Sequence, residues 1–449
     1  MKKLLSGNEA FALGAYHAGV MVASAYPGTP STEILESIAR FDGIYAEWST
    51  NEKVAMELGL GAAYAGVRAL VSMKQVGLNV ASDPFMATSI TGINGGLVVI
   101  VADDPGVFST QNEQDTRHYA KLAKVPMLEP SDSQEAYDLM AVAFELSEKF
   151  DTPVLVRSST RISHSKSVVE VNRSRPDSTK PAAFKHDVEK YVMLPVHVRL
   201  RRPMVEERLV KLNAFAETFT GNQIIRRERR LGVVSSGVAY QYAREAFPKA
   251  SFLKLGMTYP LPHNLLHKFA EGVEKLVVVE ELDPFLEENI LALGIKAIGK
   301  EFIPRIGELN SSIVEEAGYR AGLIAEPSRR KAVLPQGLPG RPPVLCAGCP
   351  HAGIFFVLNT VGQRSKLLDA RGKSEQEGKL IITGDIGCYT LATYPPLRAM
   401  DTTACMGAGI GQALGMEKAG VGNKVVAVIG DSTFLHSGAW WMQFTIRRG

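Results

Sequence analysis

The chain has 449 residues, 45% of them hydrophobic, which predicts a globular protein of two to four domains, each with its own core. The net charge is only +3 and no nucleic-acid-binding module is recognisable, so we expect no nucleic-acid partner. No apolar stretch approaches the roughly 20 residues of a membrane span, and no apolar signal region follows Lys2 and Lys3, so we expect a cytoplasmic protein without a membrane partner.

The first predicted unit, residues 1–165, alternates helical patterns with short β-rich runs. These runs are VMVASAY, RALVSM, GLVVIVA and TPVLVRS, and the alternation predicts an α/β domain with a mostly parallel sheet. YPGTPSTEI follows the first run, and Ser31 or Thr32 is placed to cap a helix that continues through Ile38. Ligands meet open α/β sheets at such turns, although an ordinary strand-turn-helix connection explains the same residues equally well.

A glutamate opens a helix rich in small residues in EWSTNEKVAMELGLGAAYAG, residues 47–66. Glu52 is a candidate catalytic carboxylate if the fold buries it, because a base that works at neutral pH needs a pKa matched to its task. The alternative is an exposed glutamate in a first helical turn, where the helix dipole favours a negative charge. The sequence leaves both interpretations open.

Residues 166–230 are predicted to form a basic connector. Between Arg173 and Arg230 there are fourteen Lys or Arg against seven Asp or Glu, so the rest of the chain carries a net charge of −4. This surplus could attract nucleic acid or an acidic partner. Few aromatic residues interleave with the charges, and we therefore favour a solvated linker face.

A second α/β unit is predicted over residues 231–330, where LGVVSSGVAY, ASFLKLG and KLVVVEELDP are strand-like. Gly- and Pro-rich residues in 331–344 predict a linker into a third unit, residues 345–449. There, GDIGCYT from Gly384 and GDSTFLHSG from Gly430 each end an apolar run, a position where backbone N–H groups bind anions. Asp431 can ligate Mg²⁺ together with phosphate oxygens. An Asp that caps a helix explains either element alone.

All four cysteines lie after residue 345, which is typical of a localised site rather than of disulfide staples. Cys346 and Cys349 form a CxxC pair, and Cys388 lies 39 residues beyond Cys349. Cys405 could complete a four-thiolate site for a [4Fe–4S] cluster or for zinc only if it folds nearby.

Together these motifs resemble the alpha subunit of indolepyruvate:ferredoxin oxidoreductase, a thiamine diphosphate-dependent family. The resemblance rests on YPGTPSTEI, TGINGGLVVIVADDPGVFSTQNEQDTRHYA, CAGCPH, GDIGCYTL, DTTACMGAGIGQALG and GDSTFLHSG, in order across almost the whole chain. It implies a multidomain α/β fold with mostly parallel sheets: a pyrimidine-binding domain, a transketolase-C-like domain and an incomplete diphosphate-binding domain. It also implies oxidative decarboxylation of aryl 2-oxoacids such as indolepyruvate to aryl-acetyl-CoA, with a beta subunit as partner and ferredoxin as electron acceptor.

The same resemblance assigns roles to residues. Glu52 would hydrogen-bond the aminopyrimidine ring of thiamine diphosphate and activate the cofactor, and Thr29 would face the substrate. Asp431 would bind the Mg²⁺ of the diphosphate, with Gly430 and Ser432. The remaining cofactor-lining residues would be Gly384, Asp385, Gly387, Cys388, Tyr389 and His351.

Related enzymes hold a [4Fe–4S] cluster with thiolates at positions comparable to Cys346, Cys349 and Cys388. The resemblance implies, however, that the alpha-subunit family carries its recognised clusters in a ferredoxin-like C-terminal domain, which we expect this chain to lack. We therefore favour no metal at these cysteines.

The chain also departs from the family pattern at its end, where AWWMQFTIRRG replaces an expected small-residue helix and the Asn-containing loop that completes the metal site. We hypothesise a frameshift near Ala439 and expect this polypeptide alone not to reduce ferredoxin. Two alternatives stay open: a non-oxidative thiamine diphosphate-dependent decarboxylase or ligase, and a catalytically dead scaffold fragment.

Overall fold

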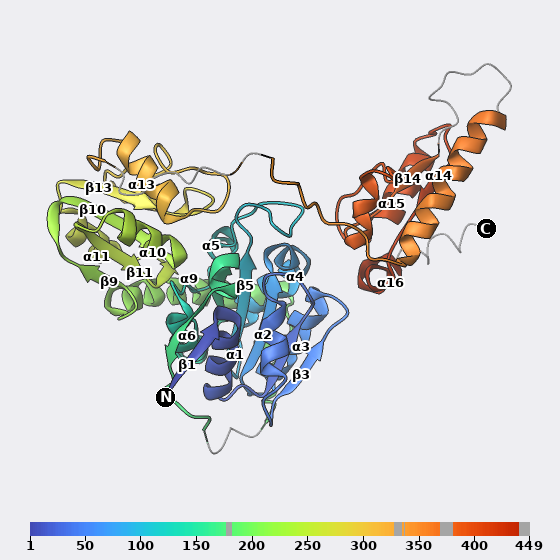
Figure 1. Ribbon diagram of the computed structural model, residues 1–449. Coiled ribbons are helices and arrows are strands. Elements are labelled where there is room, and N and C mark those ends of the chain that lie inside the picture. The colour runs from blue at the N-terminus through green and yellow to red at the C-terminus, as the bar shows by residue number, and fades with distance from the viewer. Residues whose placement is uncertain (177–181, 327–334, 336, 369–379, 440–449) are drawn as a thin grey trace. The chain divides into compact units, whose positions relative to one another are not determined.

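The computed structural model describes residues 1–449 except 177–181, 327–334, 336, 369–379 and 440–449. The side chains of 362–368 also fall outside the description. The chain folds into two compact units, an N-terminal unit of Met1–Lys331 and a C-terminal unit of Ala332–Gly449. Figure 1 colours the first from blue to yellow and the second from orange to red. In the described residues no helix has both the length and the apolar character needed to cross a membrane.

The main sheet of the N-terminal unit has seven strands in the order β12-β6-β7-β5-β4-β2-β3, and all neighbours are parallel except β12 and β6. The four predicted β-rich runs form β2, β4, β5 and β7, as expected. Their residues are mostly buried because helices cover both faces of the sheet. The strands are β2 (Val22–Ala25), β3 (Tyr45–Trp48), β4 (Ala69–Lys74), β5 (Leu97–Asp103), β6 (Met127–Leu128), β7 (Val154–Ser159) and β12 (Met257–Tyr259).

Two separate hydrophobic cores lie on the two faces of this sheet. One core holds residues of α1 (Gly7–His17), α2 (Thr32–Ile38) and α6 (Ser133–Phe150), and the other holds residues of α3 (Glu52–Tyr64) and α4 (Gln75–Thr91). Successive residues of a strand point to opposite faces, and Leu70 and Val71 of β4 accordingly lie in different cores. The helices that follow the adjacent strands β2 and β4 therefore cover opposite faces, which makes the β2–β4 boundary a topological switch point.

A second sheet in the same unit has the order β13-β10-β11-β9, with only β9 antiparallel to its neighbour. The three strand-like runs predicted after residue 230 form β10, β11 and β13. The strands are β9 (Gln223–Ile225), β10 (Glu228–Ser236), β11 (Ala250–Leu255) and β13 (Lys275–Val279). The helices of this region are α10 (Gly237–Ala246), α11 (His263–Ala270), α12 (Phe285–Ala292) and α13 (Ser311–Arg320).

The interval 166–230, predicted as a basic connector, is a structured part of the N-terminal unit. Its strand β8 (Lys166–Glu170) pairs with β1 (Lys2–Ser6), and it also contains α8 (Val188–Tyr191) and the long helix α9 (Pro195–Thr218). Helix α9 buries Val205, Arg208, Leu212 and Ala216, so only part of this segment is a solvated face. Because β12 from the interval 231–330 joins the first sheet, the division into separate pyrimidine-binding and transketolase-C-like domains stays a proposal.

The C-terminal unit is built around two parallel strands, β14 (Ile381–Thr383) and β15 (Val425–Ala427), as the two apolar runs predict. Its helical elements are α14 (Pro350–Leu368), η1 (Cys388–Thr393), α15 (Ala408–Lys418), α16 (Asp431–Thr433) and η2 (Phe434–Gly438). The buried core includes Phe355, Ile382 and Tyr389. Residues 440–449, which hold most of the divergent AWWMQFTIRRG ending, lie outside the described residues.

Candidate functional site

The turn after β2 and the start of α4 meet at the carboxyl edge of the first sheet, on either side of the switch point. Ligands of open α/β sheets bind in the crevice at such a point. Gly28 permits the close approach, because a Cβ at this position would lie 3.1 Å from the Cβ of Lys74. Thr29, the predicted substrate-facing residue, is exposed in this turn.

The hydroxyl groups of YPGTPSTEI close the turn instead of capping the helix. The Ser31 hydroxyl donates to the Gly28 carbonyl at 2.9 Å, and the Gly28 N–H donates to Thr32 Oγ1 at 2.9 Å. Ser31 occupies the N-cap position of α2, but its side chain makes no capping hydrogen bond. The expectation of a Ser31 or Thr32 cap is therefore wrong, whereas the predicted helix end at Ile38 is confirmed.

Glu52 is the first residue of α3 and is only 6% exposed. Asn51 caps this helix by accepting a hydrogen bond from the Val54 N–H at 2.9 Å. The Glu52 carboxylate lies against the first turn of α4, where a Cβ on Gly77 would be 2.6 Å from its Oε1 atom. The burial that a catalytic role requires is confirmed.

Buried polar atoms without a hydrogen-bond partner gather at this carboxyl edge. Among the described residues, Ser49 Oγ after β3, Gln75 Oε1 after β4 and Thr110 Oγ1 in the loop after β5 have no partner. Buried polar groups are otherwise nearly always hydrogen-bonded, so such a group of atoms indicates a place where a polar ligand supplies the missing contacts. The sequence patterns did not single out these residues. The position of Gln75, two residues after the strand-like run RALVSM, was the available signal.

The two glycine-acid elements contact each other in the C-terminal unit. Asp385 is fully buried, and its carboxylate accepts hydrogen bonds from the Gly407 N–H at 2.8 Å and from the Tyr389 hydroxyl. Burial raises the pKa of Asp385. The Tyr389 hydroxyl also lies 3.4 Å from Thr433 Oγ1, and a Cβ on Gly430 would be 2.8 Å from the Tyr389 ring. The structure thus brings GDIGCYT, the Gly407 segment and GDSTFLHSG together.

The other predicted cofactor residues of this unit surround the same place. His351 stacks on Tyr389, with ring centroids 4.5 Å apart and an interplanar angle of 23°. Asp431 and Ser432 are exposed at the start of α16, where their oxygen atoms are accessible to a metal ion. Gly384 and Gly387 lie in the strand-to-helix connection that follows β14. Their roles in cofactor binding stay predictions.

The cysteines do not assemble into a metal site in the described part of the chain. All four are free; Cys346, Cys388 and Cys405 are exposed and Cys349 is partly buried. No three of their sulfur atoms lie within 4.8 Å of one another. Whether Cys346, Cys349 and Cys388 bind a cluster is not decided by this arrangement, and the expectation of no metal there stays a prediction.

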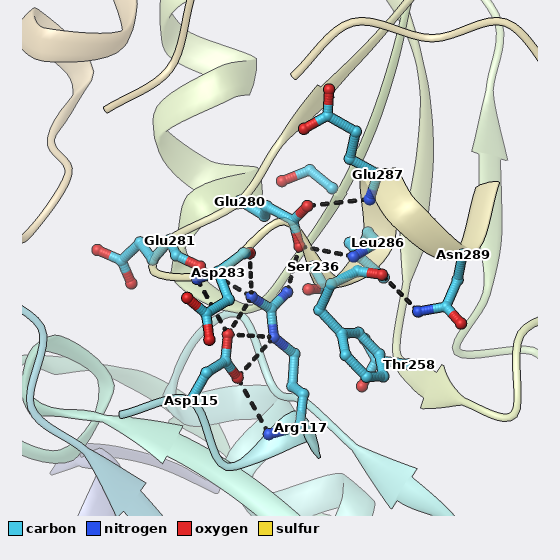
Figure 2. A network of polar contacts seen from close by, with 12 residues as sticks. Asp115, Arg117, Ser236, Thr258, Glu280, Glu281, Asp283, Leu286, Glu287 and Asn289 are labelled. Atoms are coloured by element: carbon cyan, nitrogen blue, oxygen red, sulfur yellow. Dashed lines mark hydrogen bonds and ion pairs between the residues drawn. The ribbon is translucent and has the colours of Figure 1, made fainter. Parts of the chain in front are cut away.

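A buried ion-pair network joins the two sheets of the N-terminal unit, and Arg117 is at its centre (Figure 2). The Arg117 side chain is 1% exposed and pairs with Asp115 and with Glu280, each at 2.5 Å. It also donates to the backbone carbonyl groups of Glu281 and Asp283, at 2.8 and 3.0 Å. The loop after β5 is thereby held against the loop after β13, a contact that no sequence pattern indicated.

A second buried arginine extends this network. Arg157 pairs with Asp103 at 2.6 Å and with Glu129 at 3.1 Å. Burial raises the pKa of Asp103 to about 6 and that of Glu281 to about 7. The junction therefore includes carboxyl groups that take up protons near neutral pH.

Two family models match the sequence. The model described as "Pyruvate flavodoxin/ferredoxin oxidoreductase, thiamine diP-bdg" matches residues 13–217. The model described as "Thiamine pyrophosphate enzyme, C-terminal TPP binding domain" matches residues 385–448. The first range contains Thr29, Glu52 and Lys74. The second contains GDSTFLHSG and all of GDIGCYT except Gly384.

Curated relatives match 97% of the chain. The chain is 42% identical to indolepyruvate oxidoreductase subunit IorA of Methanothermobacter thermautotrophicus, over 97% of this chain and 72% of the relative. It is 38% identical to the IorA subunit of Archaeoglobus fulgidus, over 97% of this chain and 71% of the relative. The solved 2-oxoglutarate:ferredoxin oxidoreductase of Magnetococcus marinus shares the fold, with a TM-score of 0.58 at 18% identity, over 71% of this chain and 65% of that one.

Proposed function

Because the chain belongs to the family of indolepyruvate oxidoreductase subunit IorA, we propose that it is the thiamine diphosphate-binding alpha subunit of a 2-oxoacid:ferredoxin oxidoreductase. The proposed reaction is oxidative decarboxylation of an aryl 2-oxoacid such as indolepyruvate. The acyl group passes to CoA, the electrons pass to ferredoxin, and a second subunit completes the enzyme. The observation that carries this proposal is the buried Glu52 carboxylate beside the switch point of the first sheet.

The residues present fit thiamine diphosphate. Ser49 Oγ and Gln75 Oε1, the orphaned polar atoms near Glu52, suit a polar heterocycle, because each still lacks a hydrogen-bond partner in the described part of the chain. In the C-terminal unit, Gly430 keeps the backbone free of side-chain bulk, and the Asp431 and Ser432 oxygens would hold the Mg²⁺ ion that accompanies a diphosphate. When bound, this cofactor supplies the electron sink for loss of CO₂ from a 2-oxoacid.

The chain's own contribution is orientation and electrostatics. Glu52 would hydrogen-bond the aminopyrimidine ring, and Gly77 and the first turn of α4 fix the position of its carboxylate. Thr29 would contact the substrate from the exposed turn after β2. Asp385 and Tyr389 would act indirectly, because their hydrogen bonds hold the two glycine-acid elements against each other.

Two substitutions on α3 test this proposal. Glu52→Gln keeps the size of the side chain but removes its charge, and Glu57→Gln is the control, because Glu57 is an exposed residue of the same helix that pairs with Lys53. We expect Glu52→Gln to reduce turnover of indolepyruvate by about 100-fold or more while thiamine diphosphate still binds, since acid-base roles contribute about 10²- to 10⁴-fold. Glu57→Gln should match the unsubstituted chain.

Turnover is measured with the second subunit, CoA and ferredoxin, and cofactor binding by calorimetry with and without Mg²⁺. Unchanged turnover in Glu52→Gln would refute the assignment. An absence of Mg²⁺-dependent binding heat would support a scaffold instead. Aldehyde formation without ferredoxin reduction would support a non-oxidative decarboxylase.

A further inference from the structure

Lys74 is a buried lysine whose charge has no close partner in the described chain. Its side chain is 9% exposed at the end of β4, where the chain enters α4. An ammonium group carries three donors, but the hydrogen bond that Lys74 makes is to the backbone carbonyl of Ser109. None of the described ion pairs within 4.0 Å includes Lys74. Burial lowers the pKa of Lys74, and the charge of Asp104 raises it from farther away.

The other buried lysine among the described residues, Lys254, has the ion-pair partner that Lys74 lacks. Lys254 is 5% exposed, and its ammonium group is paired with the carboxylate of Glu135. Buried charged side chains are almost always paired in this way, because an unpaired charge is unfavourable away from water. Lys74 therefore lies in a place where an anion from outside the described chain would be stabilised.

Asp104, the carboxylate whose charge acts on Lys74, already accepts hydrogen bonds from other groups. It accepts hydrogen bonds from the Ser109 N–H and from the Thr160 hydroxyl, each at 2.7 Å. These contacts keep its oxygens on the loop after β5 and on α7 (Thr160–His164). Asp104 thus offsets part of the positive charge but does not bind the ammonium group.

The position of Lys74 is that of a ligand-binding residue. It follows β4 at the switch point, and a Cβ on Gly28 would lie 3.1 Å from its Cβ and 3.6 Å from its Cδ, so its stem runs along the turn that carries Thr29. The unpartnered Thr110 Oγ1 belongs to the same loop as Ser109 and offers a further hydroxyl donor. A small anion at this edge would meet a cation and a hydroxyl group.

We propose that the Lys74 ammonium group binds the carboxylate of the 2-oxoacid substrate. This inference rests on the proposed function, which places a 2-oxoacid at the carboxyl edge of the first sheet. A phosphate group of CoA or inorganic phosphate offers similar oxygen chemistry. We assign the carboxylate because the turn with Thr29 borders Lys74, while the diphosphate belongs to the glycine-acid elements of the C-terminal unit.

The test measures binding without turnover. The purified chain is saturated with Mg²⁺ and a thiazolone analogue of thiamine diphosphate that does not support decarboxylation, and it is titrated by calorimetry with indolepyruvate or its uncharged methyl ester. We expect Lys74→Met to weaken binding of the acid by about 10- to 100-fold, the range for a lost hydrogen bond to a charged group. Binding of the ester should not change. Lys53→Met, at a partly exposed lysine near the start of α3, should change neither the dissociation constant of the acid nor that of the ester.

The outcomes separate this inference from the proposed function. Lack of Mg²⁺-dependent binding of the analogue by the unsubstituted chain would refute the proposed function. If the analogue binds normally and Lys74→Met leaves the ratio of the dissociation constants for the acid and the ester unchanged, only the role of Lys74 is refuted. A loss of affinity for inorganic phosphate or CoA, with no loss for the acid, would also overturn it and identify a phosphate site.

A measurement on the unsubstituted chain keeps the inference testable if Lys74→Met fails to fold. Acetylation of Lys74 by an amine-selective reagent is followed by peptide mass spectrometry. Indolepyruvate should slow this reaction several-fold, whereas the methyl ester should leave it unchanged. Equal rates with the acid, with the ester and with neither would overturn the assignment.

Discussion

Replacing Gly77 by alanine should disable the site without removing any functional group. The added methyl carbon would lie 2.6 Å from Oε1 and 2.7 Å from Cγ of Glu52. Carbon contacts are most favourable at about 3.5–4.0 Å, so the carboxylate or the first turn of α4 must move by about 1 Å. A misplacement of about 1 Å can lower the rate by about 100-fold, and we expect a loss of that size in Gly77→Ala.

Stability should change much less than activity in this variant. Alanine is favoured over glycine in a helix by up to about 1 kcal/mol, which partly offsets the roughly 1–3 kcal/mol expected for overpacking. Gly61→Ala is the matched control, because Gly61 lies in α3 with nothing within 4 Å of the added Cβ. It should raise the free energy of unfolding and leave turnover unchanged. If Gly77→Ala keeps full turnover and its free energy of unfolding is unchanged, the reasoning is refuted.

Three further predictions concern the buried charges. Glu281→Gln should flatten the pH dependence of stability. Its pKa is raised from 4.5 to about 7 by burial, so the folded state loses stability as pH rises from about 4.5 to 7. In urea unfolding at pH 8, the free energy of unfolding of Glu281→Gln should exceed that of the unsubstituted chain by about 3 kcal/mol. The control Glu288→Gln, at an exposed position, should show no such increase. Arg117→Met should lower the free energy of unfolding by about 3–5 kcal/mol, because it removes the ion pair of the buried Glu280 and the shorter ion pair of the buried Asp115. Asp115 would keep only the 3.8 Å pair with Arg157. A loss below about 1 kcal/mol would contradict this. Asp385→Asn should speed hydrogen exchange of the Gly407 amide, which bonds to the carboxylate, and an unchanged exchange rate would count against that role.

The local sequence predicted much of the fold because its strands carry continuous apolar runs between turn residues. RALVSM and GLVVIVA correspond to β4 and β5, which are buried along their full length. The short strands β6 and β12, of two and three residues, carry too few residues for such a pattern, and only their pairing identifies them. The basic segment before residue 230 was expected to be solvated because its composition is charged, but the spacing of Val205, Leu212 and Ala216 places an apolar face on α9.

By itself, the sequence determined where strands meet helices and which residues occupy these junctions: Thr29, Glu52, Asp385 and Asp431. Local periodicity and turn chemistry depend on a few neighbouring residues, so they can be identified from the sequence alone. The tertiary structure decided which of these groups are buried and what they contact. Gly77 packs against Glu52, Arg117 reaches Glu280, which is 163 residues away, and Lys74 stays without a carboxylate partner in the described chain. Burial and charge pairing depend on segments that are distant in sequence, so only the packed fold determines the environment in which each group acts.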